Sequence, residues 1–208
     1  MSMHIYAFGS ICRGEIDMGS DIDLLACTDG PTGKIDSEKY SIYKYERLRA
    51  LWNEGNPFAW HLHLESKLLF SPDGSDFLGD LGAPAVYGAF TKDCTKFREL
   101  FDRSHHELRL SSNSAIFHLS CIFLAIRNFA TCHSLSIGGP VFSRKSPLLV
   151  QPSLNLPPQV FSTLTRARLL STRGYGDNIT NEEVIAATQA IAIVPLWMDT
   201  LRSSIHHD

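Results

Sequence analysis

The stretch from residue 5 to residue 26 limits the fold of this 208-residue chain more than any other part of it. Residues 5–8 are apolar enough to form a strand, a Gly-Ser turn follows them, and residues 20–26 alternate as a second strand does. Because alternate residues of a strand point to the same face, Asp21 and Asp23 are expected side by side. The pattern predicts a strand, a turn and a second strand, with two carboxylates on one face of a sheet.

The residue types in this stretch suit a metal and a phosphate. Paired carboxylates such as Asp21 and Asp23 supply the oxygen ligands that a hard cation prefers, and Mg²⁺ is the natural choice. Gly9 has no Cβ and lets the backbone come close to a phosphate, to which Ser10 offers a hydroxyl and an amide. The alternative is that Asp21 and Asp23 form an exposed strand face with no chemistry.

The order Gly-Ser, spacer, Asp-x-Asp resembles the nucleotidyltransferase superfamily, and in particular the minimal nucleotidyltransferases. Arg13 and Ser20 also stand where those proteins usually carry the same residues. The resemblance is close over residues 5–26 and looser to about Tyr87. The residues that it assigns to nucleotide binding are Gly9, Ser10, Arg13 and Ser20.

The resemblance implies an enzyme that moves a nucleoside monophosphate from ATP or another nucleoside triphosphate to an acceptor hydroxyl. Asp21 and Asp23 would be its catalytic metal ligands and would bind Mg²⁺. The acceptor is expected in a cleft between the sheet and the helical part of the chain. A small molecule, a protein side chain and an RNA end are all compatible acceptors.

A third carboxylate, which the family commonly carries on the next strand, is missing from the corresponding positions. That strand is expected at residues 39–45, and its inward side chains are those of Ser41 and Tyr43. Glu65 is the candidate replacement, either as the missing carboxylate or as a general base that deprotonates the acceptor hydroxyl. Without a replacement, the chain would be a nucleotide-binding antitoxin or sensor.

Glu65 ends a segment that is compatible with two structures. Asn56 as N-cap and Pro57 at the first helical position predict a helix, which sets His61 one turn before Glu65. A strand over the same residues would place His61 and Glu65 on one face as well. Both structures group His61 with Glu65, and the alternative to a catalytic pair is a solvated face with no chemistry.

The second half of the chain reads as helical. Residues 82–88 are rich in Gly and Pro, and they divide a nucleotidyltransferase-like domain, residues 1–87, from a helical bundle domain, residues 88–208. The fold class is α+β, with a mixed sheet and flanking helices followed by the bundle. The expected helices begin at the N-cap residues Thr91 and Asn113, at Pro157-Pro158 and at Asn181, the last with a kink at Pro195.

Arg127 and His133 resemble the Arg, polar residue, spacer, His motif of HEPN domains, helical bundles found in RNases of toxin-antitoxin systems. Kanamycin-type nucleotidyltransferases also carry a helical C-terminal domain of related shape, without RNase activity. Two residues six positions apart on a straight helix point about 120° apart, so a shared site needs a distorted helix end or a second chain in a homodimer. The alternative is that both are ordinary polar residues at the end of a buried helix.

Composition excludes several classes of protein. A formal net charge of −3 gives no electrostatic footprint for binding long duplex nucleic acid, although it is compatible with a local basic patch. The N-terminal residues do not resemble a signal peptide, and no unbroken apolar run reaches the roughly 18 residues of a membrane span, so a cytoplasmic protein with no membrane partner is expected. Five cysteines without a C-x-x-C motif suggest neither a disulfide framework nor a zinc site.

Overall fold

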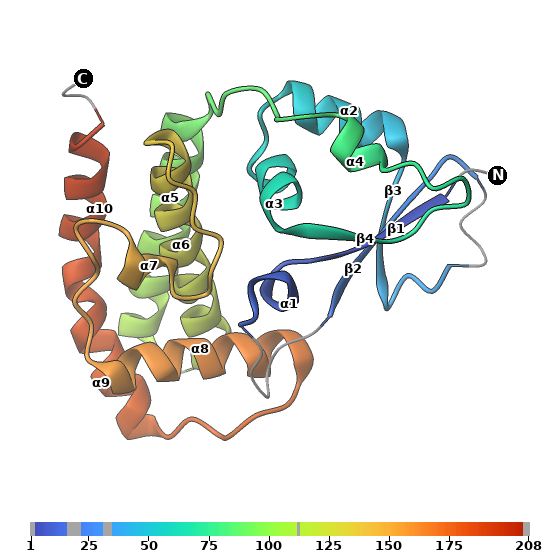
Figure 1. Ribbon diagram of the computed structural model, residues 1–208. Helices are drawn as coiled ribbons and strands as arrows, with labels where there is room; N and C mark the ends of the chain where they lie inside the picture. The colour runs from blue at the N-terminus through green and yellow to red at the C-terminus, as the bar shows by residue number, and fades with distance from the viewer. Residues whose placement is uncertain (1–2, 16–21, 31–34, 112, 206–208) are drawn as a thin grey trace. The chain divides into compact units, whose positions relative to one another are not determined.

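The computed structural model describes residues 3–15, 22–30, 35–111 and 113–205. The chain forms two compact units, Met1–Gly88 (unit 1) and Ala89–Asp208 (unit 2). Unit 1 combines a small mixed sheet with short helices, and unit 2 is helical (Figure 1). The predicted α+β class is confirmed.

The sheet of unit 1 has four strands in the order β3-β2-β1-β4. β1 is antiparallel to both of its neighbours, and β2 is parallel to β3, so the sheet is mixed as predicted. The strands are β1 (Met3–Phe8), β2 (Asp23–Thr28), β3 (Tyr40–Tyr43) and β4 (Ser66–Phe70). The part of the predicted second strand that precedes Ile22 lies outside the described residues.

The described part of unit 1 also contains four helices: α1 (Ser10–Arg13), α2 (Tyr45–Asn53), α3 (Pro57–Glu65) and α4 (Phe77–Asp80). The Asn56 side chain accepts a hydrogen bond of 2.9 Å from the Phe58 amide, and Pro57 occupies the first turn of α3. This cap satisfies an amide that has no partner within the helix. The helical alternative for this segment is therefore confirmed, and the strand alternative is wrong.

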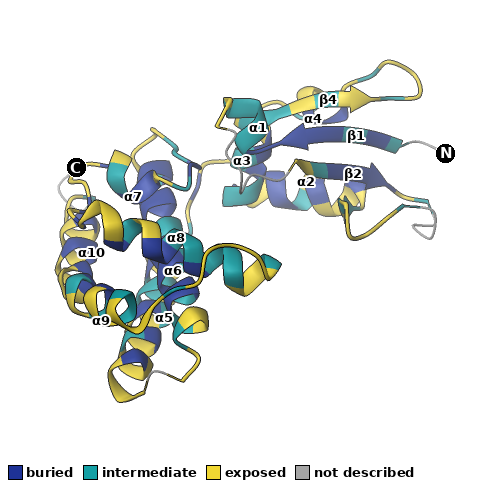
Figure 2. Cartoon of the chain, turned by 90° about the horizontal axis from the view of Figure 1, so that it is seen from below, coloured by how far each residue is buried: buried dark blue, intermediate teal, exposed yellow. Residues whose placement is uncertain are grey.

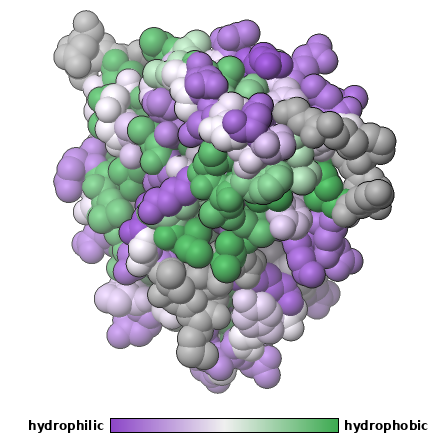
Figure 3. Space-filling model, turned by 45° about the vertical axis from the view of Figure 1, so that its right-hand side comes forward, coloured by the Kyte–Doolittle hydropathy of each residue, from purple (hydrophilic) through white to green (hydrophobic). Residues whose placement is uncertain are grey.

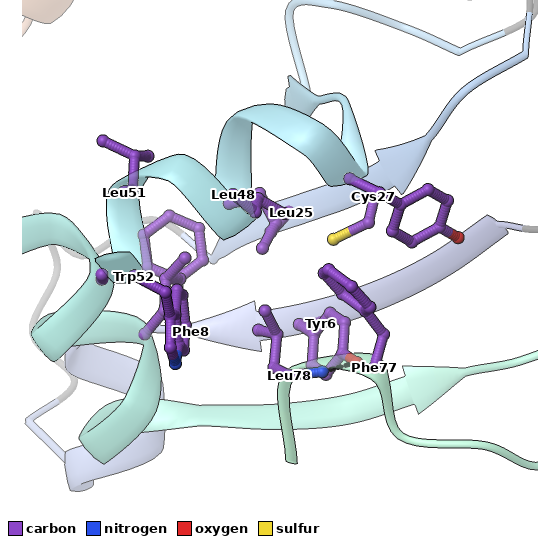
Figure 4. Close-up of a cluster of buried hydrophobic side chains, with 12 residues drawn as sticks. Tyr6, Phe8, Leu25, Cys27, Leu48, Leu51, Trp52, Phe77 and Leu78 are labelled. Carbon is purple, nitrogen blue, oxygen red and sulfur yellow. Dashed lines mark hydrogen bonds between the residues drawn. The ribbon is translucent and has the colours of Figure 1, made fainter. Parts of the chain in front are cut away.

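An apolar core holds α2, α3 and α4 to one face of the sheet. Tyr6 and Phe8 of β1 and Leu25 and Cys27 of β2 point into it and meet residues of α2, α3 and α4 (Figure 4). These helices lie behind the strands when the sheet is seen from below (Figure 2). Burial of each large side chain contributes about 1.5–3 kcal/mol, so the core fixes the face to which α3 is attached.

Large apolar side chains also reach the surface of unit 1. Leu69 and Phe70 of the edge strand β4 are 59% and 47% exposed, and Ile22 beside β2 is 59% exposed. Apolar side chains at the surface are visible in Figure 3. Single exposed apolar residues are common in folded proteins, so these three do not by themselves mark an interface.

Unit 2 is built around the long helix α6. Leu119, Ile122, Ile126 and Ala130 of this helix are fully buried, and it packs against α5, α7 and α8. The elements are α5 (Phe90–Leu110), α6 (Ala115–Ser136), α7 (Ser146–Leu149), α8 (Pro158–Arg173), α9 (Asn181–Ala190), the 3₁₀ turn η1 (Ile191–Ile193) and α10 (Val194–Ser203). Among the described residues, the helices 115–136 and 181–203 are long and apolar enough to span a membrane, but α6 owes its character to burial inside the unit.

Two of the predicted helix starts in unit 2 are displaced, and the starts at Pro157-Pro158 and at Asn181 are confirmed. The N-cap of α5 is Ala89 and that of α6 is Ser114, where Thr91 and Asn113 were expected. The N-cap of α9 is Thr180, whose hydroxyl and the Glu183 carboxylate form a reciprocal capping box. The expected kink at Pro195 is a break, because η1 separates α9 from α10 and the proline lies in the first turn of α10.

Candidate active site

The ends of three neighbouring strands, β1, β2 and β4, lie side by side at one end of the unit 1 sheet. Phe8, the last residue of β1, is paired with Asp23 of β2 on one side and with Ser66 of β4 on the other. The Gly9 amide donates a hydrogen bond of 3.0 Å to the Glu65 carbonyl and extends this ladder by one residue. The sheet therefore brings Gly9, Asp23 and Glu65 together from three separate parts of the sequence.

Gly9 occupies a position that no other residue fits without displacement. Its φ is +77°, and a Cβ at this position would lie 2.9 Å from Asp23 Oδ2 and 3.8 Å from His61 Cε1. L-residues rarely adopt this conformation, and a Cβ would be too close to the carboxylate. The turn backbone thus lies directly against Asp23, with His61 beside it.

The turn after β1 folds into the short helix α1, which carries two of the predicted nucleotide-binding residues, Ser10 and Arg13. The amides of Cys12 and Arg13 both donate to the Gly9 carbonyl, at 3.0 and 3.3 Å. The Cys12 thiol donates to the Ala7 carbonyl at 3.4 Å, and burial, with a smaller effect from the charge of Glu65, raises the pKa of this thiol. The thiol is held in the neutral form and packs the turn against β1.

Glu65 joins α3 to this turn. Its Oε2 atom accepts from Arg13 Nη1 and lies 2.9 Å from Nε2 of His61, one helical turn earlier. All three side chains are at most 18% exposed, and Arg13 Nε also contacts Glu15 at 3.0 Å. The predicted grouping of His61 with Glu65 is confirmed, and Arg13 is a third member that the sequence does not reveal.

A hollow of about 450 Å³ opens beside Asp23. It is lined by Ile22, Asp23, Leu24, Ser37, Glu38, Lys39, Tyr40 and Ser41. Ser41 is exposed there, whereas Tyr43, the other side chain expected to face inward, packs against the core. Glu38 is a second carboxylate in this hollow, and its amide bonds to Asp36 Oδ1 in a turn that directly precedes β3. Asp36 and Glu38 form an Asp-x-Glu pattern that is typical of a turn. The sequence shows this pattern, but only the pairing of β2 with β3 places Glu38 near Asp23.

This geometry can be compared with known families. Residues 3–78 match the family model of the nucleotidyltransferase domain. We found no match among curated proteins and none among solved structures. The match covers most of unit 1, contains every site residue described above and supports the superfamily that the Gly-Ser and Asp-x-Asp pattern resembles. It does not reach unit 2, so the likeness of that unit to kanamycin-type and HEPN bundles stays a prediction.

Asp23 carries the described carboxylate of unit 1 that lies against the Gly9 turn. Asp21 and Ser20 lie outside the described residues, and within the described ranges no group of three or more His, Cys, Asp or Glu residues is arranged to hold a metal ion. The Asp23 side chain is an exposed oxygen donor next to the turn, which suits a hard cation that keeps water and substrate phosphate as further ligands. Its donor chemistry therefore fits Mg²⁺.

The two residues of the HEPN-like motif have other partners inside unit 2. Arg127 Nη2 donates a hydrogen bond of 2.9 Å to the Phe142 carbonyl. His133 is 1% exposed, its Nε2 lies 3.1 Å from Ser204 Oγ, and burial lowers its pKa. These contacts are those expected of ordinary polar residues at the end of a buried helix, and they favour that interpretation over an RNase site.

Proposed function

We propose that this protein transfers a nucleoside monophosphate from a nucleoside triphosphate, most simply ATP, to an acceptor hydroxyl. One observation carries the proposal. A glycine turn lies against the first carboxylate of β2, inside the residues that match a nucleotidyltransferase domain. A phosphate-binding backbone next to a cation-binding carboxylate is the arrangement that nucleotidyl transfer needs.

The residues of the turn would bind the triphosphate. Gly9 lets a phosphate come close to the backbone because it has no Cβ, the Ser10 hydroxyl offers a hydrogen-bond donor, and Arg13 adds a positive charge. Ser20 is proposed as a further donor. Asp21 and Asp23 would hold Mg²⁺, which when bound neutralises part of the charge on the phosphates.

The hollow beside Asp23 would receive the acceptor, since its volume lies in the range of small-molecule sites. The acceptor oxygen forms a bond to the α-phosphorus while the bond from that phosphorus to the β-phosphate oxygen breaks. Pyrophosphate leaves, and the acceptor hydroxyl gives up its proton. Glu38 is the carboxylate in the hollow that could take it, and Glu65 is the one that the sequence predicts.

A second candidate is a nucleotide-binding antitoxin or sensor that does not turn ATP over. It is supported by β3, whose four residues, Tyr40–Tyr43, contain no acid at the place where the family commonly carries its third carboxylate. The RNase alternative has weaker support, because His133 is almost completely buried.

Calorimetric titration with Mg-ATP tests the site. The wild type should bind, and the double variant Asp21→Asn, Asp23→Asn should lose at least about tenfold in affinity, since removing charged ligands costs more than about 1.4 kcal/mol. Glu54→Gln is the matched control, because it removes an exposed carboxylate of unit 1 that pairs with Arg47. Undiminished affinity in a folded double variant would contradict the site.

Pyrophosphate release with a library of acceptors then separates the candidates. Release that depends on Asp23 supports the transferase. Mg-ATP binding without pyrophosphate release, whichever acceptor is added, favours the sensor or antitoxin. Cleavage of RNA without metal, lost in His133→Ala, would favour the RNase.

A further inference from the structure

Glu65 holds the turn between Gly9 and Arg13 at both of its ends. Its backbone carbonyl accepts from the Gly9 amide at 3.0 Å, and its carboxylate accepts from the Arg13 guanidinium. We propose that Glu65 is a positioning residue, which fixes the phosphate-binding turn against α3, and that it is not the base of the reaction. This inference rests on the proposed function for the role of the turn, but the two attachments are independent of it.

Burial makes the contact between Arg13 and Glu65 a strong one. The side chains are 18% and 14% exposed, whereas the Arg47 and Glu54 pair of the same unit is more than half exposed. Charge-assisted hydrogen bonds gain strength where water is partly excluded, and exposed ion pairs contribute little. The pair therefore restrains the C-terminal end of α1, which leaves Arg13 in one orientation.

His61 lies next to the Glu65 carboxylate. Its Nε2 lies 2.9 Å from Glu65 Oε2, the atom that also accepts from Arg13. Its ring packs edge-on against Phe8 at a centroid distance of 5.7 Å, and this contact anchors it to the end of β1. The Glu65 carboxylate is thus engaged with Arg13 and lies against His61, contacts that suit a positioning role.

The two roles of Glu65 predict opposite results. A positioning role requires an acceptor oxygen, which glutamine keeps and alanine lacks. Glu65→Gln should then retain most of the Mg-ATP affinity, and Glu65→Ala should lose it. A base requires a carboxylate, so Glu65→Gln and Glu65→Ala would both bind Mg-ATP and both lose turnover.

Two measurements on the full chain decide between them. Amide hydrogen exchange of residues 9–13, recorded without nucleotide, should be about tenfold faster or more in Glu65→Ala, because loss of a charge-assisted hydrogen bond allows local opening. Calorimetric titration should show about a tenfold or larger loss of Mg-ATP affinity in Glu65→Ala and a loss below about threefold in Glu65→Gln. Glu54→Ala is the control, and it should change neither quantity.

Other results would overturn the proposal. A wild-type rate of amide hydrogen exchange at residues 9–13 in Glu65→Ala would show that Glu65 does not hold the turn. If Glu65→Gln binds Mg-ATP with wild-type affinity but no longer turns it over, Glu65 is the base. If Glu65→Ala fails to fold, Arg13→Gln breaks the same contact from the turn and must give the same faster exchange. If the wild type binds no Mg-ATP, the proposed function fails, and the exchange result still decides the positioning role.

Discussion

Gly9 and Gly74 both have a positive φ and differ in their surroundings. Their φ values are +77° and +78°, both in the region that L-residues rarely adopt. A Cβ at Gly9 would press on Asp23 Oδ2, whereas a Cβ at Gly74 would meet nothing within 4 Å. The carboxylate is the end of a side chain and can rotate away, so the clash at Gly9 displaces Asp23 more than it strains the fold.

This comparison gives the first prediction. Gly9→Ala and Gly74→Ala should each lose about 1–3 kcal/mol of unfolding free energy, because alanine rarely adopts a positive φ. Only Gly9→Ala should lose Mg-ATP affinity, because it moves the carboxylate proposed to hold the cation. Urea unfolding measures the first quantity and calorimetric titration the second. Native affinity in Gly9→Ala would separate Asp23 from nucleotide binding.

Side-chain neighbours were predictable where local spacing sets them. His61 and Glu65 are four residues apart on a helix, a spacing that brings side chains together. Arg13 and Glu65 are 52 residues apart, and their contact depends on β1 and β4 lying next to each other in the sheet. Glu38 likewise lies near Asp23 because β2 pairs with β3. The sequence patterns of the two strands do not specify that pairing.

At the scale of elements, α3 links the fold of unit 1 to its site. The helix starts at a side-chain cap from Asn56, buries Ala59 and Leu62 in the core, and ends with Glu65 against the turn. Any change that frays its first turn also loosens its attachment to the site. The helix is thus a structural and a functional element together.

We therefore expect Asn56→Ala to cost about 1 kcal/mol of stability, the typical value for a lost N-cap, and to weaken Mg-ATP binding. Thr180→Ala is the matched change, since it removes the cap of α9 in unit 2 at a similar cost. Thermal unfolding and calorimetric titration of both variants check this. Equal affinities in the two variants would show that α3 does not position the site.

The sequence predicts that the helices exist more reliably than it predicts where they begin. A capping residue contributes less free energy than the burial of a large apolar side chain, so burial can move the start of a helix. The cap expected at Thr91 is worth about 1 kcal/mol. The helix instead begins at Phe90, whose side chain is 8% exposed, and burying such a side chain contributes about 1.5–3 kcal/mol. Burial of Phe90 therefore outweighs the cap at Thr91 and sets the start of α5.

On the scale of the whole molecule, the two units each carry their own tryptophan reporters. Trp52 is buried in unit 1 with its Nε1 bonded to the Gly82 carbonyl, and Trp60 lies in the same unit. Trp197 is buried in unit 2, where its Nε1 bonds to the Pro152 carbonyl. The unfolding of each unit can therefore be followed by tryptophan fluorescence in variants that keep the tryptophans of that unit alone.

Ligand binding should stabilise the unit that contains the site. A ligand at about one hundred times its dissociation constant adds about 2.7 kcal/mol to the state that binds it. In Trp197→Phe, which keeps Trp52 and Trp60, Mg-ATP should raise the midpoint of urea unfolding. In the variant Trp52→Phe, Trp60→Phe, which keeps only Trp197, the midpoint should not move.

Two controls complete this prediction. Removal of the metal with EDTA should abolish the shift in Trp197→Phe, because the triphosphate is proposed to bind together with Mg²⁺ at Asp21 and Asp23. Asp23→Asn in the same background should abolish it as well. A shift of equal size in both reporters would mean that the units unfold as one, and a shift confined to Trp197 would move the nucleotide site out of unit 1.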